Sequence, residues 1–200
     1  MLRRVVLTGA PGSGKSTLLD ALRVRGHAVV EEAATDVIAA QQARGIAEPW
    51  LCADFTDLIV ALQRARQTAP VPATVRIQLF DRSPLCTLAL ARYLQHPVGT
   101  VLQAEVERVV REQVYEREVL VVRPLGFVVA TAARRISYED SLAFQAVHET
   151  VYSEYGFELV DVPPGPTSER VAAVYAHLAS NLRSTPTPGR VPQPDVRTGH

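Results

Sequence analysis

Short apolar runs alternate with stretches of helical periodicity along most of the chain. Runs rich in β-branched residues, which are typical of strands, lie at 4–8, 28–32, 75–80, 119–122 and 157–162. Between them, apolar residues recur three or four positions apart, which is the spacing of a helix with one buried face. One long helix of this kind is predicted over 51–67. Strands that alternate with helices predict an α/β fold in three layers: a five-stranded parallel sheet with helices on both faces.

The composition changes sharply after residue 183. The chain has 200 residues, of which 47% are hydrophobic, and this is enough for one domain with a proper core but not for two. Residues 184–200 are rich in proline and nearly free of large apolar side chains. Such a segment cannot offset its ordering entropy by burial. We therefore expect one domain over residues 1–183 and a disordered tail over residues 184–200.

Charge and cysteine usage limit the classes of partner. The 21 basic and 21 acidic residues give a formal net charge of zero, so no overall field draws the chain to nucleic acid or to an anionic membrane. The apolar run near Met1 is too short for a signal peptide or a membrane span. Cys52 and Cys86 lack metal-ligand spacing and fit reduced, structural thiols. These features predict a cytoplasmic protein without nucleic-acid or membrane partners, and they do not indicate an oligomeric state.

The most specific motif lies between the first predicted strand and the helix that follows it. Residues 9–16 read GAPGSGKS, which fits G-x-x-x-x-G-K-[ST], the sequence of a phosphate-binding loop (P-loop). Glycines let successive backbone N–H groups surround a phosphate, and the helix N-terminus adds its positive dipole end. The predicted nucleotide contacts are Gly9, Ala10, Pro11, Gly12, Ser13, Gly14, Lys15, Ser16 and Thr17.

Lys15 and Ser16 have separate expected roles in this loop. The Lys15 ammonium neutralises β- and γ-phosphate oxygens, and the Ser16 hydroxyl ligates Mg²⁺. Of the 21 basic residues only Lys15 is a lysine, which agrees with the need for a compact ammonium inside the loop. ATP and Mg²⁺ are therefore the predicted cofactors.

Asp81 and Arg82 follow the third predicted strand. Because ligands on parallel sheets lie at the carboxyl ends of the strands, we expect Asp81 near Ser16, where its carboxylate holds a Mg²⁺-bound water. Capping of the helix that follows is the alternative role for Asp81. Arg82 is expected to point into the site as a clamp on phosphate or substrate, with a plain surface arginine as the alternative.

Two further carboxylates end the second predicted strand. Glu31 and Glu32 are adjacent, and adjacent residues in a strand point to opposite faces, so only one of them can face the cleft. We favour Glu32 as the base that accepts the proton of an attacking hydroxyl. Two alternatives remain: Glu31 is the base, or both carboxylates are purely structural.

Several residues outside these motifs are weaker candidates. Arg134 and Arg135 precede Ser137, which resembles a helix cap, in a segment that could fold over bound ATP and bring positive charge to the transferring phosphoryl group. Arg135 is the preferred residue of the two. His148 lies on the apolar face of its helix and is interpreted as a core histidine, whereas Trp50 could line either an acceptor pocket or the core.

A resemblance to a known family is carried by four segments: GAPGSGKSTLLDAL, VVEEAA, LFDRSPLCTLALARYL and ARRISYEDSLAFQAVHETVYSEYGFELVDVP. They resemble the AAA-type P-loop NTPase domain of the NadR (nicotinamide-riboside kinase-like) group, over about residues 1–182. More distantly, Asp81-Arg82-Ser83 is similar to the D/E-R-S/Y motif of deoxynucleoside and thymidylate kinases. In those enzymes a carboxylate after the second strand is the base and lid arginines surround the phosphates. The resemblance therefore implies a nucleoside-kinase-like fold and such roles for Glu32, Asp81, Arg82 and Arg135.

Together these features predict a kinase that transfers the γ-phosphate of Mg-ATP to a small, hydroxyl-bearing, nucleoside-like metabolite. The expected catalytic residues are Lys15, Glu32, Asp81, Arg82 and Arg135, with Ser16 and Asp81 on the metal side. A non-kinase ATPase or an ATP-dependent regulatory switch is the alternative. A GTPase is disfavoured because the chain lacks the N-K-x-D run of that class: its one asparagine, Asn181, has no lysine beside it.

Overall fold

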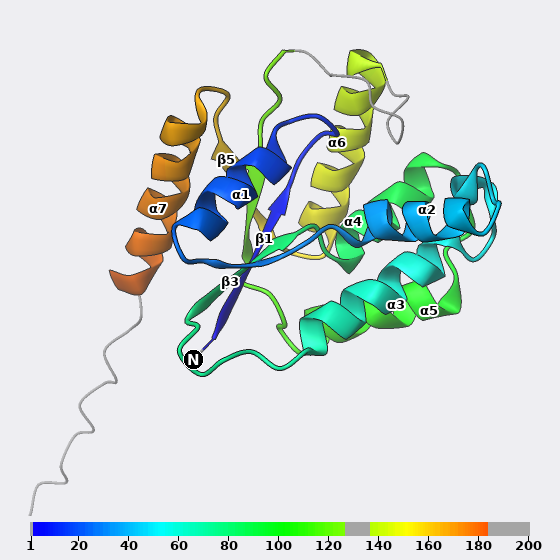
Figure 1. Cartoon of the computed structure of the whole chain (residues 1–200), viewed down its shortest axis with the longest axis horizontal. Helices are drawn as coiled ribbons and strands as arrows, with labels where there is room; N and C mark the ends of the chain where they lie inside the picture. The colour runs from blue at the N-terminus through cyan, green and yellow to red at the C-terminus, as the bar shows by residue number, and fades with distance from the viewer. Residues whose placement is uncertain (1, 127–136, 184–200) are drawn as a thin grey trace, which may run out of the picture.

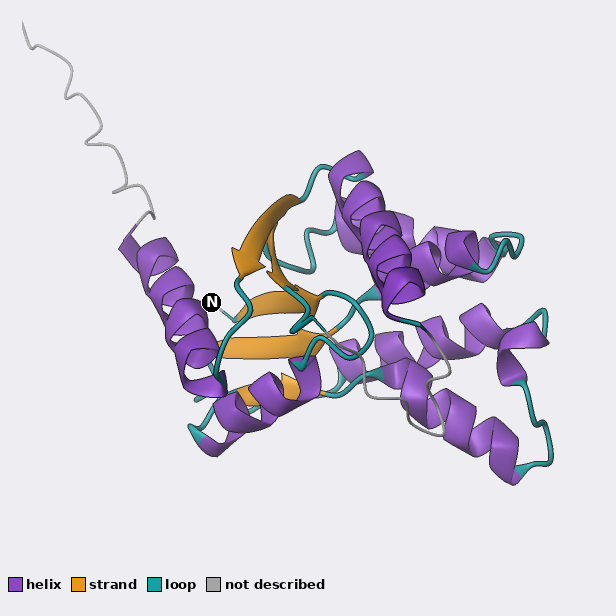
Figure 2. Ribbon diagram, turned by 90° about the horizontal axis from the view of Figure 1, so that it is seen from above, coloured by secondary structure: helices purple, strands orange, loops and turns teal. Residues whose placement is uncertain are grey.

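The computed structural model describes residues 2–126 and 137–183, and in this part of the chain strands and helices alternate as expected (Figure 1 and Figure 2). The strands are β1 (Arg3–Thr8), β2 (Ala28–Val30), β3 (Ile77–Asp81), β4 (Glu118–Val122) and β5 (Glu158–Val162). The helices are α1 (Lys15–Val24), α2 (Ala33–Ala43), α3 (Phe55–Thr68), α4 (Pro84–Tyr93), α5 (Thr100–Arg111), α6 (Tyr138–Glu154) and α7 (Thr167–Arg183). A short 3₁₀ helix, Pro49–Leu51, precedes α3.

The sheet has five parallel strands in the order β2-β3-β1-β4-β5. The first strand of the chain is therefore the central strand, with β3 on one side and β4 on the other. In the register of the sheet, Leu7 of β1 lies opposite both Asp81 of β3 and Leu120 of β4. The strand order reverses beside β1, and the carboxyl edge at such a reversal is where ligands bind in parallel sheets.

Helices cover both faces of this sheet. One core cluster joins Val5 and Leu7 of β1 to residues of α1 and α7, and the other joins Val6 to residues of α4, α5 and α6. Figure 1 shows these two groups of helices on opposite sides of the strands. Successive residues of β1 thus point to opposite faces of the sheet, as the geometry of a strand requires. A smaller cluster around Phe55 and Ile59 lies between α2 and α3.

Two predicted element boundaries near the site are wrong by two residues or more. The second strand ends at Val30, so that Glu31 and Glu32 lie in the connection to α2, where Glu32 is the N-cap residue. The long helix begins at Phe55 rather than at residue 51, because the segment that begins at Pro49 forms a 3₁₀ turn. In the first case the strand ends where its apolar residues end, and the two glutamates that follow begin the turn into α2.

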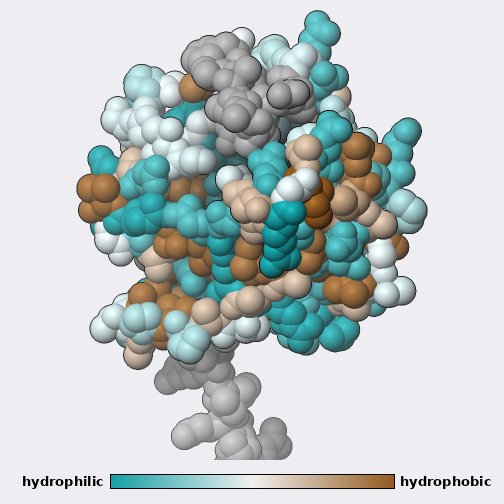
Figure 3. Space-filling model, turned by 45° about the vertical axis from the view of Figure 1, so that its right-hand side comes forward, coloured by the Kyte–Doolittle hydropathy of each residue, from teal (hydrophilic) through white to brown (hydrophobic). Residues whose placement is uncertain are grey.

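The surface of the described residues is mixed in character. On the face that Figure 3 displays, hydrophobic and hydrophilic side chains are interspersed. None of the helices in residues 2–126 and 137–183 is both long enough and apolar enough to cross a membrane. The predicted tail, 184–200, lies outside the described residues, and the domain boundary at residue 183 stays a prediction.

Candidate nucleotide-binding and acceptor site

The P-loop is built on glycines that other residues could not replace. Gly9 has a φ of +134°, and a Cβ at this position would lie 2.4 Å from the carbonyl oxygen of Val122 at the end of β4. Gly14 has a φ of +83° and is the N-cap of α1. The chain can therefore turn tightly from β1 into α1, which brings the first backbone N–H groups of the helix to the carboxyl edge of the sheet. This is the geometry of an anion-binding site.

Lys15 lies inside the loop that contains it. Its side chain is buried, and Nζ donates hydrogen bonds to the carbonyl oxygens of Gly9 at 3.3 Å and Ala10 at 3.2 Å. Ser16 and Thr17 follow it as exposed residues in the first turn of α1. An ammonium group and two accessible hydroxyl groups thus stand together at the N-terminus of a helix.

A side chain of α6, which the sequence did not reveal, also holds the P-loop. Gln145 Oε1 accepts a hydrogen bond from the backbone N–H of Ala10 at 3.2 Å, although the two residues are 135 positions apart. The amide group is itself oriented, because Gln145 Nε2 donates to Glu149 at 2.9 Å. The conformation of the loop therefore depends on α6 as well as on its own glycines.

Asp81 is a buried carboxylate beside the P-loop. It ends β3 opposite Leu7, is 5% exposed, and its Oδ1 has no hydrogen-bond partner among the described residues. Burial raises the pKa of Asp81, an effect that the charge of Lys15 opposes and the charge of Glu32 strengthens. A buried carboxylate oxygen without a donor in this part of the chain can accept a hydrogen bond from a bound molecule, and a Mg²⁺-bound water fits this description.

No group of three or more His, Cys, Asp or Glu side chains in the described residues is arranged to hold a metal ion by itself. A Mg²⁺ ion beside Ser16 and Asp81 would therefore take most of its ligands from phosphate and water, which is how Mg²⁺ is usually bound at nucleotide sites.

Arg82 connects the P-loop side of the site to a neighbouring cavity. Its φ of 73° lies in the left-handed region that arginine rarely adopts, and its side chain is largely buried. Nε donates to Glu32 Oε1 at 2.6 Å, and Nη1 lies 3.0 Å from His148 Nε2. Arg82 is thus a pocket residue and not a plain surface arginine.

The two candidate bases lie in different surroundings. Glu32 is 22% exposed, and its Oε2 accepts a hydrogen bond from Thr35 Oγ1 at 2.8 Å. Burial opposes its ionisation, but the charges of Arg82 and Lys15 and the hydrogen bonds from Thr35 and Arg82 outweigh this and lower its pKa to about 2. Glu31, in contrast, is exposed and pairs with an arginine of α1. Of the two carboxylates, only Glu32 faces the cavity.

His148 is a fully buried residue of α6 that contacts Arg82. Its Nδ1 lies 2.9 Å from the carbonyl oxygen of Phe144. A guanidinium can only donate, so His148 Nε2 accepts from Arg82 and Nδ1 carries the proton, which makes the ring neutral. Burial, followed by the charge of Arg82, lowers the pKa of His148 well below its usual value. The interpretation as a core histidine agrees with the burial of the ring but missed this contact.

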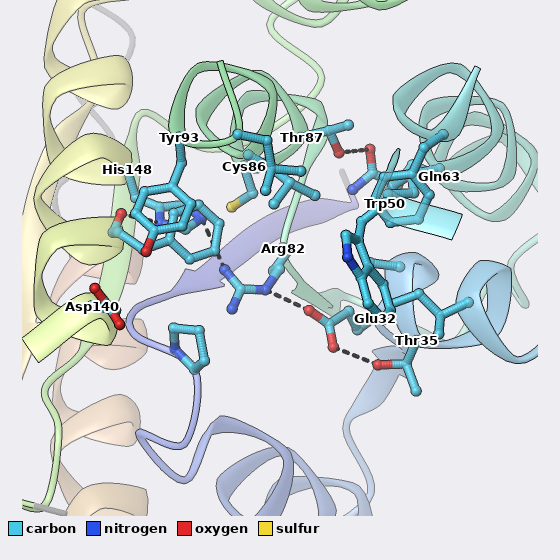
Figure 4. A pocket seen from close by; sticks show the side chains of 18 of the residues that line it. Glu32, Thr35, Trp50, Gln63, Arg82, Cys86, Thr87, Tyr93, Asp140 and His148 are labelled. Carbon is cyan, nitrogen blue, oxygen red and sulfur yellow. Dashed lines mark hydrogen bonds and ion pairs between the residues drawn. The ribbon is translucent and has the colours of Figure 1, made fainter. Parts of the chain in front are cut away.

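A cavity of about 510 Å³ opens beside the P-loop. Figure 4 shows Arg82 in its middle, with Glu32 and Thr35 on one side and His148 on the other. Gln63 and Thr87 lie farther along the wall, joined by a hydrogen bond of 2.9 Å. The apolar part of the wall is formed by Ile38, Trp50, Phe55, Ile59, Leu90, Tyr93, Leu94 and Phe144. Because Pro11 of the P-loop also lines the cavity, the two sites adjoin.

The structure thus brings Lys15, Glu32, Asp81 and Arg82 to one edge of the sheet, and it places Trp50 in the cavity wall rather than in the core alone. Arg134 and Arg135 lie outside the described residues, so the predicted role of Arg135 stays a prediction.

These features define a class of protein. A P-loop between the central strand and the first helix, in a parallel sheet of order 2-3-1-4-5, is the P-loop NTPase fold. The chain belongs to the AAA domain family, whose model matches residues 4–170. This confirms the family resemblance seen in the sequence. No curated protein matches the chain.

Solved structures with the same fold include two of NadR and one of a deoxyadenosine kinase. NadR in complex with NR has 19% identity and a TM-score of 0.65, with 89% of this chain and 51% of NadR covered. NadR in complex with NAD and AMP-PNP has 17% identity and a TM-score of 0.63, with 96% and 52% covered. Deoxyadenosine kinase from M. mycoides with dCMP and dCDP has 16% identity and a TM-score of 0.58, with 88% and 99% covered.

The chain therefore spans about half the length of NadR. At these identities the likeness establishes the shared fold, and it confirms the predicted three-layer, nucleoside-kinase-like architecture.

Proposed function

We propose that the protein is a kinase that transfers the γ-phosphate of Mg-ATP to a hydroxyl group of a small, nucleoside-like acceptor. The observation that carries this proposal is the cavity beside the P-loop, which has Pro11 and Glu32 in its wall. Hydrolysis of ATP needs room only for water, whereas a cavity of about 510 Å³ has room for a second small-molecule substrate. The same fold in NadR is found with AMP-PNP, and in deoxyadenosine kinase with dCDP.

On the nucleotide side, the P-loop N–H groups, Lys15 and the N-terminus of α1 would bind the triphosphate and stabilise the charge that develops on the transferring phosphoryl group. The Ser16 hydroxyl and, through water, the Asp81 carboxylate would hold Mg²⁺. When bound, this ion neutralises phosphate charge. The unpartnered Oδ1 of Asp81 supports this assignment.

On the acceptor side, Glu32 would orient and deprotonate the attacking hydroxyl. With a pKa of about 2, Glu32 is ionised at neutral pH, and Arg82 and Thr35 hold its two oxygens in place. Each oxygen keeps a lone pair with which to accept a further hydrogen bond. Such a carboxylate is a weak base, which suffices because phosphoryl transfer through a loose transition state asks little of the base.

The charge of the cavity limits the class of acceptor. Among the described residues that line it, three are acidic (Glu32, Glu48 and Asp140) and one, Arg82, is basic, so the lining has a formal net charge of −2. A phosphorylated acceptor would add negative charge beside both these carboxylates and ATP, so an unphosphorylated acceptor is favoured. The aromatic wall, including Trp50, suits a flat ring.

The test is a screen of Mg-ATP turnover, measured as ADP release, with nucleosides, the matching nucleoside 5′-monophosphates and non-nucleoside alcohols. We expect an unphosphorylated, nucleoside-like compound to accelerate ADP release by about tenfold or more, with its phosphorylated product visible by mass spectrometry. The Lys15→Ala variant is the control and should show neither effect. If turnover stays slow with every compound, the alternative of an ATPase or regulatory switch replaces the kinase. Preference for monophosphates would contradict the charge argument.

A further inference from the structure

Arg170 is a buried arginine that contacts the P-loop. The proposed reaction assigns no role to this residue. It lies in the first turn of α7 and is 3% exposed. All three guanidinium nitrogens donate hydrogen bonds: Nη1 to the carbonyl oxygen of Ser13 at 2.5 Å, Nε to that of Pro163 at 3.2 Å, and Nη2 to that of Arg123. Every one of these acceptors is a main-chain oxygen, so the side chain binds backbone rather than other side chains.

The three carbonyl groups belong to three different segments, each of which follows a strand. Ser13 follows β1, Arg123 follows β4 and Pro163 follows β5, and these strands are neighbours in the sheet. A planar guanidinium with five donors can bridge three such acceptors in a fixed geometry, which a lysine cannot do. Arg170 therefore ties the P-loop to the two segments beside it.

The guanidinium carries a charge that no carboxylate among the described residues neutralises. Two other largely buried arginines do have carboxylate partners: Arg82 pairs with Glu32, and Arg108 pairs with Glu105. Burial lowers the pKa of Arg170, as expected where desolvation of a cation is only partly offset. A buried charge without a counter-ion is costly, and an anion bound nearby would reduce that cost.

The position of Arg170 relative to Gly14 shows where such an anion would bind. A Cβ added at Gly14, the N-cap of α1, would lie 3.1 Å from Arg170 Nη1. Nη1 holds the Ser13 carbonyl, and the C=O and N–H of one trans peptide point in opposite directions. The Gly14 N–H therefore points away from Arg170. It is one of the N–H groups at the start of α1 that a bound phosphate requires.

We propose that Arg170 is a positioning residue for the triphosphate of the nucleotide. It holds the Ser13–Gly14 peptide with its N–H directed at the phosphates, and its own charge gains an anionic partner when a triphosphate occupies the P-loop. This inference rests on the nucleotide binding proposed above.

The experiment compares three full-length variants with the wild type by calorimetry, using Mg-ATP and inorganic tripolyphosphate as the probes. Arg170→Met removes the charge and the donors but keeps the length of the side chain, and Arg170→Lys keeps the charge but loses the planar fork. Arg92→Met, in which an exposed arginine is removed from α4, is the matched control. Emission from the single tryptophan, Trp50, which lines the acceptor cavity, reports whether each variant is folded there.

We expect Arg170→Met to bind both probes about 10- to 100-fold more weakly, which is the range of a lost charge-assisted hydrogen bond. Arg170→Lys should lose less, and Arg92→Met should match the wild type. In the identified reaction, the KM for ATP should rise more than kcat falls, which a merely structural role would not produce.

Wild-type affinity for both probes in a folded Arg170→Met protein overturns the inference. If Arg170→Met does not fold, unchanged affinity in Arg170→Lys overturns the inference. If neither variant folds, Arg170 has only a structural role in the domain, and the inference is again overturned. Failure of the wild type to bind Mg-ATP is a separate result that contradicts the proposed function itself.

Discussion

At the scale of single residues, the site depends on which of two adjacent carboxylates faces the cavity. Glu32 is held by Arg82 and Thr35 beside the P-loop, whereas Glu31 is exposed and pairs with an arginine of α1. The two side chains have the same chemistry and are neighbours in the chain. Glu31 is therefore a matched control for any experiment on Glu32.

We predict that Glu32→Gln lowers turnover of the acceptor by about 10²-fold at saturating ATP, because an amide cannot take the hydroxyl proton. Affinity for Mg-ATP should stay nearly unchanged, since Glu32 lies on the acceptor side. Glu31→Gln should resemble the wild type in both measurements. Steady-state kinetics with the acceptor found by the screen, and calorimetry with Mg-ATP, provide the two readouts.

A larger loss in Glu31→Gln than in Glu32→Gln would show that the assignment of the base is wrong. If neither variant loses turnover, the carboxylate is structural, and the reaction needs no base at this position. Melting temperatures of both variants are needed beside the kinetics, because Glu32→Gln also removes the carboxylate partner of the largely buried Arg82.

Residue-scale features could be predicted from the sequence when their contacts are local. The P-loop is a run of consecutive residues, so its motif contains nearly all of its geometry. Asp81 and Glu32 could be found because each lies at or just beyond the carboxyl end of an apolar strand. The contacts of Gln145 with Ala10 and of Arg170 with Ser13 join residues 135 and 157 positions apart. No periodicity or motif links such residues, and only the packed fold reveals them.

At the scale of elements, one face of α6 connects the two halves of the site. Gln145 contacts the P-loop, His148 contacts Arg82, and Glu149 contacts Arg123. These three residues are spaced i, i+3 and i+4, so they lie on one side of the helix. A displacement of α6 would therefore disturb the nucleotide side and the acceptor side together.

The pH dependence of stability should report on His148. Its pKa is lowered in the folded protein, so below the unfolded value of about 6.5 the unfolded chain binds a proton that the folded protein does not. The free energy of unfolding should therefore fall as the pH is lowered below about 6.5, with a slope of up to about 1.4 kcal/mol per pH unit contributed by this residue. Urea unfolding of wild type and His148→Gln between about pH 7 and 5 measures the difference.

The contribution of His27, whose pKa burial also lowers, is present in both proteins and cancels in the comparison. Identical pH dependence in wild type and His148→Gln would contradict a neutral, buried His148.

The start of α3 shows why element ends are harder to predict than element types. Leu51 precedes Phe55 by four residues, so it continues the apolar spacing of the helix, yet it lies in the 3₁₀ turn and is 67% exposed. Spacing indicates which face of a helix is apolar. It does not indicate where backbone hydrogen bonding begins, which Pro49 and the turn after it decide here.

At the scale of the whole molecule, the layer architecture could be predicted because alternation of strands and helices leaves few packings for a parallel sheet.

The last prediction concerns the C-terminal boundary of the domain. We predict that a chain ending at Arg183 has the melting temperature and the Mg-ATP affinity of the full chain. The reason is that residues 184–200 offer almost no large apolar side chain to bury. Differential scanning calorimetry and titration calorimetry check the two parts, and a drop of several degrees would show that the tail packs on the domain.

The burial of Lys15 in the P-loop has a consequence for chemical modification of the protein at its amino groups. Because Lys15 is the only lysine in the sequence, the chain has a single ε-amino group, and that group lies where the phosphates are proposed to bind. Reagents that acylate amines can modify only this side chain and the α-amino group. Protection of Lys15 from such a reagent would therefore serve as a direct measure of site occupancy, and immobilisation through lysine would block the site it was meant to present.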